Sequence, residues 1–384
     1  MTILRVDTLS GIGTNGPVFD GDLEFNSQNY VILPKGTTDN RIGLTSTSGA
    51  LRYNTDSSKV ELYDGNQWTE VQSSRPDLNG GARGLFGGGY TGPGVSSLTI
   101  DYINISSTGN AQNFGNLIAY HTSAATVSSS TRGIWAGGYQ AGVSDTNVID
   151  YITISSTGNA QDFGDLLTVN RNFTGTSSST RGVFIGGNVQ TAPAYADTNV
   201  IQYITIASTG DAKDFGDIIG TLQTSTSCSS STRGVFAGGY FNRVAPANPL
   251  TNLINYITIS TLGNSQDFGD LTAPKCNLAS CSNPIRGVFS GGRVPTLTNV
   301  IEYVTIATAG NSVRFGDLTV SKQDLNNAGA SSPTRGTFAG GRAPGSSNVI
   351  DYITFSSQGN AVDFGDLTTP TVYKAGCSNA HGGL

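Results

Sequence analysis

Histidine is the side chain most often used for acid–base catalysis and metal binding near neutral pH. This chain of 384 residues has two, His121 and His381. Neither belongs to an HExxH, GxSxG or phosphate-loop pattern. We expect both to be structural. The four cysteines form no CxxC motif and no Cys/His cluster, so we expect buried free thiols there and not a metal or redox site.

Carboxylates are the second possible source of chemistry. A DFG tripeptide recurs at Asp162, Asp214, Asp267 and Asp363, but no kinase-type glycine-rich loop accompanies it. Paired carboxylates such as Asp162 and Asp165 could bind calcium, which needs six to eight oxygen ligands. Hydrogen bonding at turns or strand ends is the alternative that we favour. Glycosidases need two carboxylates facing each other across a pocket, and the sequence singles out no such pair. We expect no metal, no cofactor and no enzymatic activity.

Arginine recurs with a regular spacing of about fifty residues, each time in a string such as RGVFAGGY. A group repeated at one position usually satisfies carbonyls or a carboxylate at a turn. We expect this structural role, although six arginines around one end of a ring could instead form an anion-binding mouth. The six are Arg83, Arg132, Arg181, Arg233, Arg286 and Arg335.

Composition limits the classes of protein to consider. Charged residues make up 12% of the chain and the net charge is −6. This balance argues against nucleic-acid binding, which needs clustered Lys and Arg. No apolar run is long enough to span a membrane, and the first twenty residues lack the apolar core of a secretory signal. We expect synthesis in a cytoplasm and no membrane insertion.

The elements that position these residues form a repeat. In the unit spanning 122–166, we expect four strands: 122–130, 133–138, 147–155 and 160–166. The third alternates apolar and polar residues with a period of two, and the STGN turn after it suits a hairpin. Four antiparallel strands in each unit of about fifty residues are typical of a β-propeller blade.

Six arginines predict six blades, and the apolar run ending in Gly-Gly before a tyrosine-bearing strand resembles a kelch repeat. Phenylalanine stands where kelch repeats usually carry tryptophan, so the resemblance is to a divergent kelch-like family. The predicted fold class is all-β, with a six-bladed kelch-like β-propeller at 77–384. The segment 372–384 matches a first strand and turn, which predicts that the C-terminal strand completes the first blade. The phenylalanines are Phe114, Phe163, Phe215, Phe268, Phe315 and Phe364.

The segment 1–76 has a different pattern of short β runs and is too small to be stable alone. We expect a β-rich, intertwined oligomerisation region. Its strings LPKGTTDNR and GALRYNTDSSKVELYDGNQW resemble the shaft and base modules of tailed-phage appendages, tail fibres especially. The start TILRVDTLSGIGT is similar to the virion-attaching end of such fibres. This resemblance implies a homotrimer that attaches to other virion proteins through 1–76.

The repeats differ mainly in two kinds of connection, which join strands two and three or join one blade to the next. Both emerge on one face of a four-strand meander, and the longest lie in blades three and four. Loops on a rigid scaffold commonly carry binding specificity, although surface loops also simply tolerate insertions. The candidate receptor-binding residues, which combine aromatic and hydrogen-bonding groups, are Tyr195, Asp197, Tyr240, Phe241, Asn242 and Arg243.

The sequence therefore predicts a phage virion appendage that binds a host-surface glycan or protein through the variable face of its propeller. One alternative is a purely structural decoration or adaptor protein of the virion. A polysaccharide-degrading enzyme ranks third.

Overall fold

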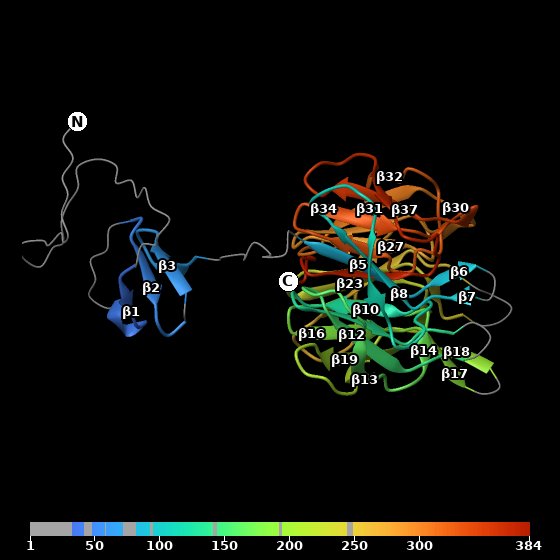
Figure 1. Cartoon of the computed structure of the whole chain (residues 1–384), viewed down its shortest axis with the longest axis horizontal. Coiled ribbons are helices and arrows are strands. Elements are labelled where there is room, and N and C mark those ends of the chain that lie inside the picture. The colour runs from blue at the N-terminus through green and yellow to red at the C-terminus, as the bar shows by residue number, and fades with distance from the viewer. Residues whose placement is uncertain are drawn as a thin grey trace, which may run out of the picture. The chain divides into compact units, whose positions relative to one another are not determined.

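The all-β class is confirmed by the computed structural model. It describes residues 33–41, 48–57, 59–71, 82–92, 95–140, 144–191, 194–243 and 249–384. Apart from strands, the described residues contain one 3-10 helix, Asp39–Arg41. The chain divides into two compact units, Met1–Arg75 and Pro76–Leu384. Figure 1 shows strands in both units.

The smaller unit contains one four-stranded sheet in the order β1 (Lys35–Gly36), β2 (Leu51–Asn54), β3 (Lys59–Tyr63) and β4 (Trp68–Glu70). β1 and β2 are parallel, and the other neighbours are antiparallel. Glu61 on β3 is fully buried. It accepts a hydrogen bond from Asn54 at 2.7 Å and forms an ion pair with Arg41. The intertwined trimer stays a prediction, and residues 1–32 lie outside the described residues.

The larger unit contains six four-stranded antiparallel sheets, as in a β-propeller; five have their strands in chain order, and the remaining one begins with the C-terminal strand. Sheet one is β39 (Ala375–Ser378), β5 (Arg83–Gly87), β8 (Thr99–Asn104) and β9 (Gln112–Asn116). Sheet two is β10 (Ala125–Ser128), β11 (Arg132–Ala136), β12 (Val148–Thr153) and β13 (Gln161–Asp165). Sheet three is β15 (Thr174–Ser177), β16 (Arg181–Ile185), β19 (Val200–Thr205) and β20 (Lys213–Asp217).

Sheets four to six repeat the same order. Sheet four is β22 (Thr226–Ser229), β23 (Arg233–Ala237), β25 (Leu253–Thr258) and β26 (Gln266–Asp270). Sheet five is β27 (Ala279–Ser282), β28 (Arg286–Ser290), β31 (Val300–Thr305) and β32 (Val313–Asp317). Sheet six is β33 (Gly329–Ser331), β34 (Arg335–Ala339), β37 (Val349–Thr354) and β38 (Val362–Asp366). The first strand of each sheet contacts the first strands of the neighbouring sheets, and we call it the inner strand.

The first sheet joins the two ends of this unit. β39 pairs antiparallel with β5, in the register Ala375 to Gly87 and Ser378 to Gly84. This is the pairing that the C-terminal segment predicts, because 372–378 repeats the first-strand pattern. In Figure 1 the blue–cyan β5 accordingly lies within the part of the cartoon coloured orange and red.

Short strands of two to four residues lie in the connections between second and third strands and, at Asn170–Arg171 and Leu222–Gln223, in the connections between one sheet and the next. They are β6 (Tyr90–Gly92), β7 (Val95–Ser96), β14 (Asn170–Arg171), β17 (Asn188–Thr191), β18 (Ala194–Asp197), β21 (Leu222–Gln223), β24 (Tyr240–Phe241), β29 (Arg293–Val294), β30 (Thr296–Leu297), β35 (Arg342–Ala343) and β36 (Gly345–Ser346).

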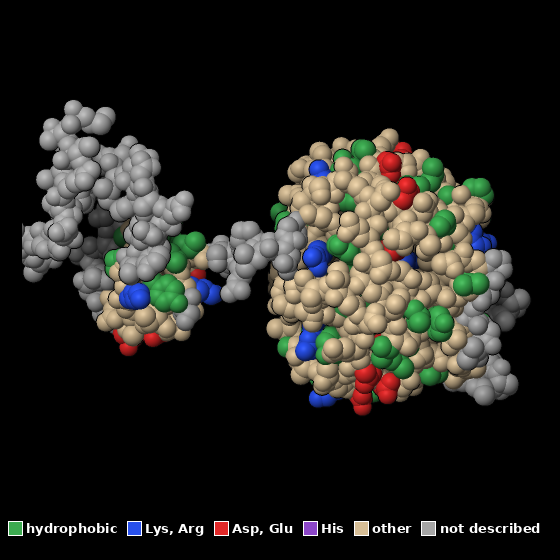
Figure 2. Space-filling model, viewed as in Figure 1, with side chains coloured by type: hydrophobic (Ala, Val, Ile, Leu, Met, Phe, Trp, Pro, Cys, Tyr) green, Lys and Arg blue, Asp and Glu red, His purple; other side chains and the backbone are tan. Residues whose placement is uncertain are grey.

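Apolar side chains pack in six clusters, and each cluster is shared by two neighbouring sheets. Within every sheet, the fourth-strand phenylalanine packs edge-on against the third-strand tyrosine, as Phe163 does on Tyr151 at 5.9 Å. The Gly-Gly pairs allow close backbone contact: Gly88 has φ +71°, and a Cβ there would overlap the carbonyl oxygen of His121. On the face of this unit that Figure 2 shows, charged side chains are few and scattered.

Candidate functional site

The two variable connections of each sheet meet. The residue after each Gly-Gly pair bridges the connection that precedes the same sheet, as Tyr90 does to Val372 and Tyr139 to Thr122. These six residues occupy the same position in every sheet but differ in residue type, whereas the Gly-Gly pair before them is the same in all six sheets. They are Tyr90, Tyr139, Asn188, Tyr240, Arg293 and Arg342.

A second set of six residues lies beside them. Each is a non-glycine residue in the left-handed region, with φ between 54° and 58°, at the same position of every sheet-to-sheet connection. Their backbones hydrogen-bond from one connection to the next, as in Asn172 N–H to the Ser123 carbonyl at 2.9 Å and Ser123 N–H to the Tyr373 carbonyl at 3.3 Å. We call both sets together the mouth residues; the second set is Ser123, Asn172, Thr224, Asn277, Asp324 and Tyr373.

A hollow of about 310 Å³ opens among the mouth residues of sheets six, one and two. Its lining combines aromatic rings, two guanidinium groups and small hydrogen-bonding groups. This is the combination that ligand pockets use, with a few polar groups placed among aromatic surfaces. The lining residues are Tyr90, Thr122, Ser123, Tyr139, Arg171, Asn172, Arg342 and Tyr373.

Arg171 forms one wall of this hollow. Its guanidinium carbon lies 5.1 Å from the ring centroid of Tyr139 and 4.3 Å from that of Tyr195, so the group is held between two aromatic rings. Beneath it, Asp145 approaches Arg171 Nη1 at 3.5 Å. Both carboxylate oxygens of Asp145 are buried without a hydrogen bond to any described residue, and this burial raises its pKa against the opposing effect of Arg171.

Arg342 forms another wall in a similar way. Its Nε lies 3.0 Å from Asp324, whose side chain is buried. Burial raises the pKa of Asp324, while Arg342 and hydrogen bonds from Tyr373 and Asn277 oppose the change. Burial and the neighbouring Asp324 carboxylate likewise raise the pKa of the Tyr373 phenol. Both arginines are therefore oriented by carboxylates that lie below them.

The sequence-predicted receptor-binding residues fall into two groups. Tyr195 contacts the hollow through Arg171, and its side chain is 41% exposed. Asp197 accepts from Asn188 at 2.9 Å and from Arg243 at 3.0 Å, which links the connections of sheets three and four. The structure thus brings Tyr195, Asp197 and Arg243 into one neighbourhood beside the hollow.

The other three have different surroundings. Tyr240 is a mouth residue; burial raises its phenol pKa, and the neighbouring Cys276 thiol adds to this effect. Phe241 packs against the core shared by sheets three and four. Asn242 has φ +47° and accepts a hydrogen bond from Thr221 N–H at 2.9 Å, so its side chain holds a turn.

The repeated arginines all make the same contact. Each donates from Nη1 to a carbonyl at the end of the third strand of the next sheet, as Arg83 does to Ile154 at 2.8 Å and Arg132 to Ile206 at 2.9 Å. Each also lies over the third-strand tyrosine of its own sheet, as Arg132 does over Tyr151 at 4.7 Å. The remaining pairs are Arg181 with Ile259, Arg233 with Ile306, Arg286 with Phe355 and Arg335 with Ile105.

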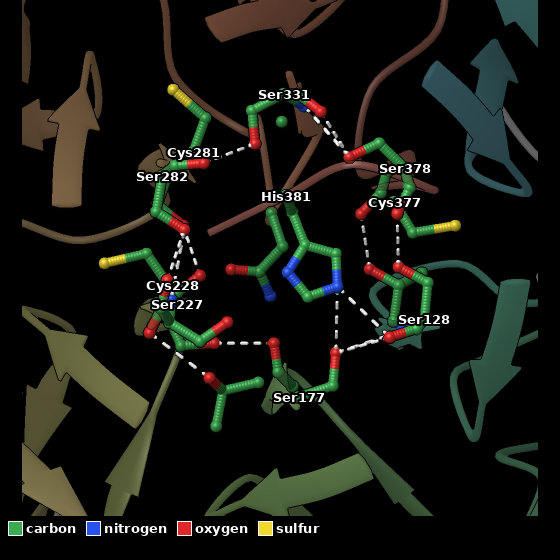
Figure 3. A pocket seen from close by; sticks show the side chains of 18 of the residues that line it. Ser128, Ser177, Ser227, Cys228, Cys281, Ser282, Ser331, Cys377, Ser378 and His381 are labelled. Atoms are coloured by element: carbon green, nitrogen blue, oxygen red, sulfur yellow. Dashed lines mark hydrogen bonds between the residues drawn. The ribbon is translucent and has the colours of Figure 1, made fainter. Parts of the chain in front are cut away.

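The space between the inner strands is nearly filled. A residual cavity of about 60 Å³ is lined by small side chains of all six inner strands. Figure 3 shows the His381 imidazole surrounded by serines of these strands. Its Nε2 donates to the Ser128 carbonyl at 3.1 Å, and its Nδ1 accepts from Gly383 N–H at 3.0 Å. Burial lowers the pKa of His381 to about 4, against the effect of the Ser128 carbonyl.

Two asparagines close this space on the side of the mouth residues. Asn326 and Asn327 form an insertion that the other five connections lack. Asn327 accepts from Thr174 Oγ1 at 3.1 Å, and Asn326 donates to the Ala124 carbonyl at 3.2 Å. A ligand at the hollow is therefore separated from the central cavity by protein.

Buried ion pairs connect neighbouring sheets, and the sequence did not reveal them. Asp150 pairs with His121 at 3.3 Å, and Asp351 pairs with Lys322 at 2.6 Å. In each case a basic side chain from a sheet-to-sheet connection meets a third-strand carboxylate next to a β-bulge, which directs the side chain away from the regular pleat. The other two pairs are Lys275 with Glu302 and Lys374 with Asp101.

None of these pairs forms a metal-type cluster. Within the described ranges, no three His, Cys, Asp or Glu side chains lie close enough to hold a metal ion. The four cysteines are free and buried. Among the same residues, no helix has the length and apolar character needed to cross a membrane.

Comparison with models of known protein families gives no match, and comparison with curated proteins gives none either. The hollow itself was missed by reasoning from loop length, which pointed to sheets three and four. A better signal was the single variable position after the invariant Gly-Gly, where three tyrosines and two arginines occur.

Proposed function

We propose that this chain is a tailed-phage virion appendage protein of the tail-fibre type, which binds a host-surface receptor through the hollow that opens among its mouth residues. The hollow carries the proposal: aromatic rings and guanidinium groups gather where the two variable connections of otherwise similar units meet. The resemblance of 1–76 to phage shaft and base modules supports attachment to other virion proteins, as a homotrimer located on the virion.

The proposal takes the six sheets as the blades of one closed, kelch-like propeller. Three observations support it. The inner strands contact one another in the cycle β39, β10, β15, β22, β27, β33 and back to β39. The arginine-to-carbonyl bonds follow the same cycle and return from Arg335 to sheet one. Serine hydroxyls of neighbouring inner strands also link the sheets, as Ser128 Oγ does to the Ser378 carbonyl at 2.8 Å. Such a closed ring would hold the mouth residues rigid.

The test is binding of the fluorescently labelled full-length protein to a panel of bacterial strains. We expect saturable binding to at least one strain, and its loss when Tyr90 and Tyr139 are both replaced by alanine. A matched control is Leu262→Ala, which removes an exposed side chain from a turn at the opposite end of its sheet. Binding that survives the double replacement would overturn the assigned surface. No binding to any strain would favour a structural decoration or adaptor protein.

A further inference from the structure

The charges that a ligand meets in the hollow are positive, although each arginine has an acidic partner. The side chains of Asp145 and Asp324 are 0% and 1% exposed, whereas those of Arg171 and Arg342 are 23% and 44% exposed. The carboxylates lie under the guanidinium groups and are not available as acceptors. A ligand therefore contacts hydrogen-bond donors and cations.

The two arginines also have donors to spare. A guanidinium has five N–H donors in a planar fork that matches a carboxylate. Arg342 uses Nε for Asp324, and within the described ranges its terminal nitrogens have no hydrogen-bond acceptor. The Arg171 group is fixed between Tyr139 and Tyr195, so it loses little further freedom when a ligand binds.

The remaining lining fits a sugar ring. Tyr90 and Tyr139 give flat apolar faces beside hydroxyl and amide groups of Ser123 and Asn172. The volume of about 310 Å³ is at the low end of the range for small-molecule pockets. It suits a small ligand unit and not an extended peptide.

We infer that the hollow binds an acidic saccharide, a sugar residue whose carboxylate is held by Arg342 and Arg171 while its ring lies against Tyr90 and Tyr139. This inference rests on the proposed receptor-binding function and names the chemical class of the receptor. The acidic partners Asp145 and Asp324 act as positioning residues that orient the two guanidinium groups.

The experiment measures binding of the full-length protein to a panel of short saccharides rich in glucuronate, galacturonate or sialate. Each is compared with its methyl ester, which has the same rings without the charge, and with sulfated and phosphorylated sugars of equal length. We expect at least one carboxylated saccharide to bind, with affinity reduced at least tenfold in its ester. Equal binding of acid and ester, or binding of the sulfated or phosphorylated sugars alone, would overturn the carboxylate assignment.

Arg342→Gln supplies the matching protein test, with Arg293→Gln as its control. Arg293 also follows a Gly-Gly pair and is exposed, but it does not line the hollow. We expect Arg342→Gln to weaken acid binding at least tenfold and Arg293→Gln to leave it unchanged. Asn277 and Tyr373 still donate hydrogen bonds to Asp324 in Arg342→Gln, so we expect both variants to stay folded, which a melting curve checks. Equal affinities of the two variants for the acid would overturn the inference.

The two proposals can fail separately. Mouth-dependent cell binding without binding of any acidic saccharide would reject only the ligand class. If the protein binds neither cells nor saccharides, both proposals fail.

Discussion

At the residue scale, His381 shows how burial sets the charge state of a single side chain. It lies three residues after β39, and its ring enters the space between the inner strands. The Gly383 N–H donates to Nδ1 and the Ser128 carbonyl accepts from Nε2, so the bonds around the ring require the neutral tautomer. A proton on Nδ1 would face the N–H of Gly383, so two hydrogen-bond donors would point at each other.

This environment predicts a loss of stability in mild acid. The pKa of His381 is about 4 in the folded protein and ordinarily about 6.5, so the unfolded state binds the proton first as the pH falls. The contribution of His381 to stability is complete above pH 6.5 and is lost as the pH falls towards 4. We expect a loss of about 1–3 kcal/mol, allowing for partial solvent access to the ring.

Urea unfolding of the full-length protein between pH 7.5 and 4.5 measures this loss. His381→Gln is the matched variant, because glutamine can donate a hydrogen bond but does not titrate. We expect its pH dependence to be smaller by the same 1–3 kcal/mol. Identical pH profiles for the two proteins would show that His381 does not titrate in this range.

At the scale of elements, the buried pairs indicate that a sheet-to-sheet connection and the third strand of the following sheet carry side chains of matching charge where they face each other. The basic side chains at positions 121, 275 and 322 each face a third-strand carboxylate. At the equivalent positions, Asn170 and Leu222 occur with the neutral Gln202 and Asn255, whereas in sheet one Lys374, three residues after the equivalent Thr371, faces Asp101. Each buried third-strand carboxylate therefore has a basic partner, as expected where burying one unpaired charge is costly.

This matching predicts a rescue. Lys322→Leu leaves the buried Asp351 carboxylate without its cation, and we expect a loss of about 3–5 kcal/mol in the free energy of unfolding. Adding Asp351→Asn copies the Leu222 and Asn255 pair of sheet four and restores most of the loss. A double-mutant cycle by urea unfolding measures the coupling. Additive effects of the two substitutions would contradict the explanation.

The same elements show what sequence reasoning can and cannot reach. The second, third and fourth strands were predictable because their residue patterns recur in register in every unit, as Ile201 does at the second position of each third strand. The ion pairs were not, because a β-bulge changes which side chains face the neighbouring sheet. The hollow was missed because Arg171 and Tyr139 are distant in sequence, and only the assembled connections bring them together.

At the scale of the whole molecule, the larger unit depends on its last strand. β39 is the inner strand of sheet one and contacts the inner strands of sheets two and six. Its serine, Ser378, exchanges hydrogen bonds with Ser331 and accepts from Ser128, so three sheets lose partners if it is removed. Lys374, just before β39, also supplies the cation for the buried Asp101.

Two truncations separate the strand from the tail that follows it. Deleting 370–384 removes β39 and Lys374, and we expect cooperative unfolding of the larger unit to disappear. The deletion would leave sheet one with an apolar, unpaired inner edge and a buried carboxylate without its cation.

Deleting only 379–384 removes His381 and its surroundings but keeps β39. We expect that shorter deletion to lower the melting temperature while the transition stays cooperative, because all six sheets retain four strands. Calorimetry on both truncated proteins and on the full chain makes the comparison. An unchanged melting temperature after the longer deletion would mean that the C-terminal strand does not hold the sheets together.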